Sequence, residues 1–190
     1  MLKRLKTVIA TMSLIVFLTP VSTFASTKTN SDFTVKDITL SEIPSDVTPM
    51  KFNSEEEAEN YFNNAVNGIE NANTTIVEPE MTLYDYRGHR YAEKRGWPVT
   101  IAMDVPYLAK WSSKWGNYYA SASKPSTSIA GTTIGFEWRE ISSATYSNIG
   151  SNPTKLTAHG EGYLDYYVII EGGIKYYTKR ISVDGSWGQP

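Results

Sequence analysis

The clearest hydrophobic pattern in the chain lies between residues 54 and 70 and is helical. Apolar residues recur there three and four positions apart, which places them on one face of an α-helix. They are Ala58, Tyr61, Phe62, Ala65, Val66 and Ile69. Asn53 or Ser54 can cap the first turn, and Glu57 stands where a capping box requires an acid. We therefore predict one amphipathic helix over about residues 54–70.

From residue 75 to the C-terminus the pattern changes to the two-residue period of β-strands. Residues 99–105, for example, alternate between large apolar and polar or small side chains, so one face of this segment is expected to be buried. Proline-containing turn signals such as Lys124-Pro125 separate the short strands. The fold predicted is α+β and mostly β: an antiparallel β-sandwich or barrel-like sheet with one N-terminal helix.

One hairpin can be predicted in detail, over residues 164–183. Gly172-Gly173 would form its two-residue turn, because glycine adopts the positive φ angles of the tight hairpin turns. Counting outward from that turn places Asp165 opposite Arg180, and their opposite charges fit this register.

The first 25 residues have the order of a secretory signal. Basic residues at positions 3, 4 and 6 precede an apolar run over 8–18, and Thr23-Phe24-Ala25 puts small residues where signal peptidase reads them. The eleven-residue run is too short to span a bilayer. We expect cleavage near Ala25, secretion, and no transmembrane segment in the mature chain.

The remaining 165 residues are expected to form one globular domain. Residues 26–50 are predicted to be a flexible or extended leader. Residues 51–190 form the domain, with the helix at 54–70 and β structure over 75–190. The chain has no cysteine, which excludes cysteine nucleophiles, thiolate zinc sites and disulfides.

Charge is distributed unevenly along the mature chain. Residues 26–80 hold eleven acids and three bases, whereas residues 81–190 hold nine acids and twelve bases. This asymmetry fits either electrostatic complementarity within one fold or a basic surface for an acidic partner. The mature chain is acidic overall, with 15 basic and 20 acidic residues, so no nucleic-acid partner is expected.

Common catalytic motifs are absent, and no cofactor is predicted. One candidate polar patch comes from strand periodicity, which places His159 and Glu161 on one face, with Asp184 on the paired strand. An imidazole with two carboxylates suits a metal or a general base, although the same pattern describes a solvated sheet face. The identity of any metal is left open.

Two further groups of residues could bind a ligand. A basic loop is expected around Arg87, with His89, Arg90 and Arg95. An aromatic surface is expected from Trp111, Trp115 and Tyr118. Indole and phenol rings that remain exposed form contact surfaces for sugars or proteins, and flanking lysines and serines favour exposure of the two tryptophans.

These features favour a secreted binding or interaction module, with a cell-envelope, carbohydrate or protein partner, over an enzyme. The alternative is a secreted hydrolase or metal-dependent site around His159. A further alternative is a membrane-active, pore-forming toxin, because residues 121–133 are rich in serine and threonine.

The signal prediction can be checked on the secreted product. Its intact mass should correspond to a chain that begins at Ser26. A membrane-bound product that retains Met1 would contradict the prediction.

Overall fold

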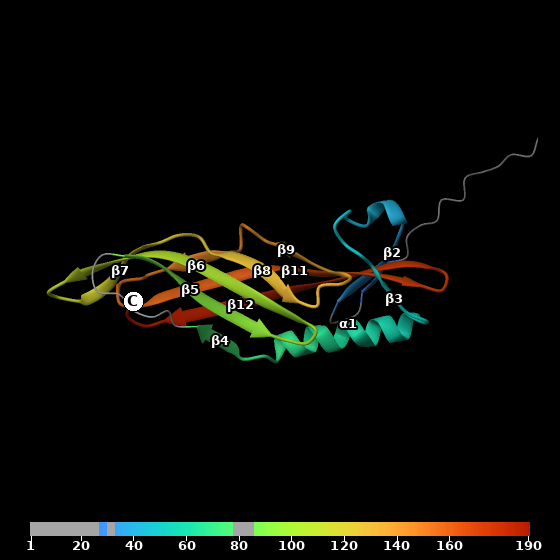
Figure 1. The fold of residues 1–190 in the computed structure, drawn as a ribbon, viewed down its shortest axis with the longest axis horizontal. Helices are drawn as coiled ribbons and strands as arrows, with labels where there is room; N and C mark the ends of the chain where they lie inside the picture. Colours follow the sequence, from blue (N-terminus) through green and yellow to red (C-terminus); the bar gives the residue numbers. More distant parts are fainter. Residues whose placement is uncertain (1–26, 30–32, 78–85) are drawn as a thin grey trace, which may run out of the picture.

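The described part of the chain folds into two β-sheets and one α-helix, arranged along one long axis (Figure 1). The computed structural model describes residues 27–29, 33–77 and 86–190. Strands predominate, and the strand pairs are antiparallel apart from one. The predicted α+β, mostly β fold is confirmed. The predicted signal segment lies outside the described residues.

The first sheet is built on a long hairpin of β11 (Leu156–Ile170) and β12 (Gly173–Trp187). Next to β12 lie β2 (Thr34–Ile38) and then β1 (Thr27–Thr29). The other edge of β11 pairs with three short strands in turn. These are β10 (Tyr146–Asn148), β9 (Phe136–Glu140) and the parallel β3 (Met50–Lys51).

The second sheet consists of β4 (Thr74–Val77), β5 (Tyr86–Arg95), β6 (Val99–Ser112), β7 (Gly116–Ala122) and β8 (Ser126–Gly131). Both β7 and β8 pair with the same edge of β6, one after the other. Lys124-Pro125, expected as a turn between strands, instead interrupts this edge, where proline is tolerated. Residues 121–133 therefore do not form a hairpin of their own.

The predicted helix is confirmed as α1 (Glu55–Glu70). The Ser54 hydroxyl accepts a hydrogen bond from the Glu57 amide, and three glutamates occupy the first turn, where the helix dipole favours negative charge. Helix α1 contacts strands of both sheets: β11 and β12 of the first, and β5 and β6 of the second. At its centre the Phe62 ring stacks on Tyr166 at 5.6 Å and meets Phe33 edge-on at 5.3 Å.

The segment predicted as a leader contributes β1 and β2 to the first sheet, and it contributes to the core from Phe33 onward. Phe33 and Val35 are buried in the core, and β2 pairs with β12 over five positions. A short 3₁₀ turn, η1 (Leu40–Glu42), follows this strand. The core therefore begins before residue 51, because β2 extends the sheet that α1 covers.

The predicted hairpin exists, but its predicted register was wrong by two residues. The two-residue turn is Glu171-Gly172, with Gly172 at a φ of +99°, and Gly173 is already paired with Ile170. Asp165 consequently faces Thr178 and not Arg180. The buried Asp165 carboxylate accepts hydrogen bonds from Tyr176 and Thr178, and Arg139 lies 3.0 Å away as its counter-charge.

Truncating the Phe62 ring should show how much the packing of α1 against the sheets contributes to the free energy of unfolding. Phe62→Ala is expected to lower the free energy of unfolding by about 3–5 kcal/mol, because it removes a fully buried ring and leaves a cavity. Urea unfolding followed by circular dichroism measures this. The exposed Leu40→Ala is the control, with an expected change within about 0.5 kcal/mol. Equal effects of the two substitutions would contradict the assignment of Phe62 to the buried core.

Candidate functional site

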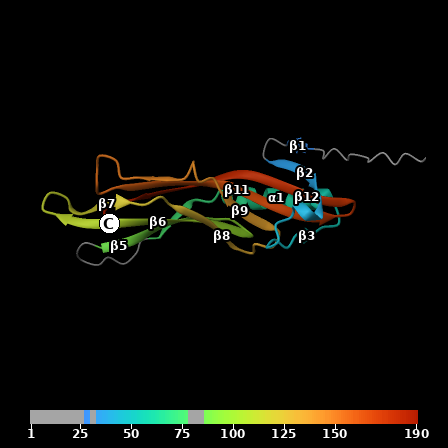
Figure 2. The ribbon, with the colours of Figure 1, turned by 90° about the horizontal axis from the view of Figure 1, so that it is seen from above.

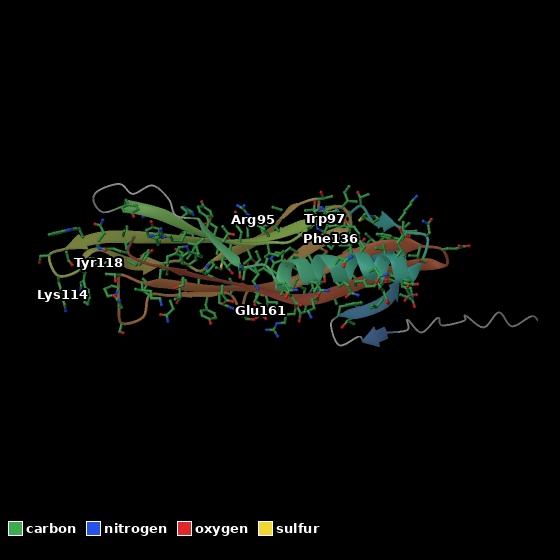
Figure 3. The ribbon with its side chains drawn as sticks, turned by 90° about the horizontal axis from the view of Figure 1, so that it is seen from below. Arg95, Trp97, Lys114, Tyr118, Phe136 and Glu161 are labelled. Atoms are coloured by element: carbon green, nitrogen blue, oxygen red, sulfur yellow. The ribbon has the colours of Figure 1, made fainter. Side chains whose placement is uncertain are left out.

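The β6–β7 hairpin ends in an exposed aromatic and basic turn, which we call the tip and define as residues 110–118. Trp111 is 63% exposed and Trp115 is 39% exposed. Lys110 and Lys114 are also exposed: Lys110 points to the opposite face of the hairpin from Trp111, and the Lys114 ammonium lies 4.7 Å from the centre of the Trp115 ring. Figure 3 shows Lys114 at one end of the long axis. The tip therefore presents two indoles and two cations away from the body of the protein.

Hydrogen bonds hold the backbone of the tip in place. Gly116, with a φ of +69° that favours glycine, begins β7 directly after the three-residue loop and pairs with Ser112. The Ser112 hydroxyl accepts from the Trp115 amide, at 3.2 Å. The Gln189 side chain donates to the carbonyls of Trp115 and Asn117, at 3.2 and 2.9 Å. The tip is thus braced by the C-terminal residues.

A buried arginine fixes those C-terminal residues to the second sheet. Arg90 is only 2% exposed, and its guanidinium donates to the Tyr119 hydroxyl and to the Gln189 carbonyl. Tyr119 in turn donates to the Gly188 carbonyl at 2.8 Å. Strands β5 and β7 are therefore both tied to the chain end that supports the tip.

Tyr118, predicted to share an aromatic surface with the two tryptophans, belongs to the other face of the hairpin. It pairs with Lys110, whereas Trp111 pairs with Asn117 one position along. Neighbouring positions in a strand point to opposite faces. The prediction of exposed tryptophans agrees with the structure, and Tyr118 is only partly exposed behind them.

The polar patch of His159, Glu161 and Asp184 does come together on one face. His159 Nδ1 lies 2.7 Å from Asp184, directly opposite in the register, and Nε2 lies 3.8 Å from Glu161. The Tyr146 ring stacks on the imidazole at 5.4 Å. Gly160 and Gly162 leave the pairing of β11 with β12 unbroken, so no bulge separates these side chains.

Arg180 neutralises part of this patch. Its guanidinium makes two ion-pair contacts with the Glu161 carboxylate, one at 2.7 Å, and Glu161 is only 14% exposed. The hydrogen bond from Arg180 lowers the pKa of Glu161 below its ordinary value of 4.5. Within the described parts of the chain, no group of three or more acidic or histidine side chains is arranged to hold a metal ion.

The predicted basic loop is instead strand β5, and its members point two ways. Arg87, His89 and Arg95 are exposed, whereas Arg90 faces the core. His89 is paired with Asp104 at 2.8 Å, and Arg95 with Glu93 at 2.6 Å. The four residues therefore do not form one cationic cluster, because strand alternation divides them and acids partner two of them.

Three surface hollows could accept small groups. One of about 490 Å³ lies between Asp46–Thr48, Ile129 and Thr133–Trp138 and was not predicted, because distant segments line it. A second, of about 410 Å³, includes Arg87, His89 and Ser121. The third, of about 250 Å³, lies in the loop around Asn148–Asn152. Trp111 and Trp115 line none of the three.

No family model, curated protein or solved structure matches this chain. Among the helices of the described residues, none has the length and apolar character needed to cross a membrane. Functional inference therefore depends on the geometry of the chain itself.

Removing Arg180 should expose the electrostatic role of its contact with Glu161. A carboxylate with a lowered pKa stabilises the fold at a pH above its ordinary value of 4.5, and this contribution is lost as the pH falls through the lowered value. Arg180→Gln should therefore destabilise the protein at neutral pH and progressively less in acid. Urea unfolding across this range measures the difference. Arg87→Gln, another exposed arginine, is the control, and a pH-independent effect of Arg180→Gln would contradict the assignment.

Proposed function

We propose that this chain is a secreted binding protein that attaches to an extracellular target through the tip of the β6–β7 hairpin. Secretion is proposed from the basic, apolar and small-residue order of the first 25 residues. Binding is proposed from the exposure of Trp111 and Trp115 at the end of the molecule.

The observation that carries the proposal is that these indoles are exposed on a braced backbone. Large aromatic side chains are usually buried for the most part, and their exposure costs hydrophobic free energy unless a partner covers them. The bonds from Gln189 and Ser112 reduce the backbone ordering that binding would require. A preorganised aromatic surface of this kind is typical of binding anchors.

The polar patch supports catalysis less well. In a histidine-based hydrolase, one ring nitrogen is held by a carboxylate and the other meets a nucleophile or water. Here Nδ1 of His159 meets Asp184, but Nε2 is directed towards Glu161, which Arg180 already engages. We therefore place the binding function at the tip.

Binding of the labelled mature protein to the producing cells, measured by flow cytometry, tests this proposal. Trp111→Ala with Trp115→Ala should reduce binding at least about 100-fold, since each ring contributes on the order of 1.5–3 kcal/mol when it is buried. Trp97→Ala is the matched control, because Trp97 is 70% exposed but contacts Tyr61 of α1, away from the tip. Undiminished binding by the double variant, or equal loss with Trp97→Ala, would overturn the proposal.

A further inference from the structure

The shape and chemistry of the tip indicate one kind of target more than others. We infer that the tip binds the surface of a lipid bilayer that carries anionic headgroups. This inference deepens the proposed function and rests on it, because it names the target of the same residues.

The shape of the tip suits a flat, soft surface. Lys114 of the tip lies at one end of the long axis of the described residues, so the tip can approach a flat surface end-on (Figure 3). Its two indoles line none of the three hollows described above, and Trp111 is 63% exposed. A projecting turn can enter the headgroup region, where backbone groups still find water.

The side chains of the tip match the chemistry of a membrane interface. Tryptophan prefers the boundary between headgroups and acyl chains, because its ring is apolar and its N–H can be hydrogen-bonded. Lysine places an apolar stem along such a surface and its ammonium at the phosphates. Lys114 already lies over the Trp115 ring, and Lys110 precedes Trp111.

Charge around the tip favours an anionic membrane over a neutral one. Within the tip, residues 110–118, the sequence has two lysines and no acidic residue. Helix α1, by contrast, carries five glutamates and no basic residue. An anionic surface would attract the tip and repel the helix, which orients the molecule.

Vesicle co-sedimentation tests the inference. Wild type should sediment with vesicles of phosphatidylcholine mixed with phosphatidylglycerol, weakly with phosphatidylcholine alone, and less as salt is added. Trp111→Ala with Trp115→Ala should abolish sedimentation. Lys110→Gln with Lys114→Gln should weaken it roughly 25-fold at low salt, since each lysine near an anionic surface contributes about fivefold.

Two controls separate the tip from the rest of the surface. Trp97→Ala and Lys124→Gln, which change an exposed indole and a lysine outside the tip, should sediment like wild type. Thermal unfolding checks that each variant is folded. If a double variant is unfolded, the wild-type protein is tested instead, by measuring whether brominated lipid quenches its tryptophan fluorescence. An absence of quenching would overturn the inference.

The cell-binding and vesicle assays together distinguish failure of the lipid target from failure of the proposed binding function. Tip-dependent binding to cells without binding to anionic vesicles would overturn the lipid target and leave the binding function standing, with a glycan or protein as its target. Binding to vesicles that survives loss of both tip tryptophans would also overturn the inference. Failure in both assays would overturn both proposals.

Discussion

The arrangement of the molecule follows from one constraint, the length of the β11–β12 hairpin. All fifteen residues of β11 pair with β12, so the ribbon extends for roughly 50 Å at about 3.3 Å per residue. One face of this ribbon is apolar along most of its length and must be covered. The sixteen residues of α1 extend only about 24 Å. The helix therefore shares the covering with the second sheet, and the protein becomes long and narrow (Figure 2).

The parts of the fold that depend on local periodicity were predictable. The α1 stripe and the buried face of residues 99–105 each repeat with a fixed period, and burial follows that period. The hairpin register was not predictable in the same way, because Gly172 and Gly173 both suit a turn. An error of two residues keeps every side chain on its own face. For that reason His159 and Asp184 were correctly placed on one face, although the register predicted for the hairpin was two residues off.

In the candidate sites, too, the features that depend on local sequence were predictable and those that depend on distant partners were not. Exposure of Trp111 and Trp115 was predictable from the lysines and serines around them. Arg90 was misassigned, because four basic or histidine residues close in sequence suggested a loop, whereas a strand sends alternate side chains inward. Its burial is tolerated because Tyr119 and the Gln189 carbonyl accept its hydrogen bonds, and these partners lie 29 and 99 residues away. Partners so distant leave no local signal in the sequence.

The position of the C-terminus has a practical consequence. The carbonyls of Gly188 and Gln189 accept hydrogen bonds from Tyr119 and Arg90, beside the exposed indoles. Strand β1 lies towards the opposite end of the molecule (Figure 2). A purification tag or fluorophore fused after Pro190 would crowd the very turn whose contacts an assay sets out to measure. Anchoring the protein by its amino-terminal side would instead leave that turn facing solution, as a sensor or an immobilised capture reagent requires.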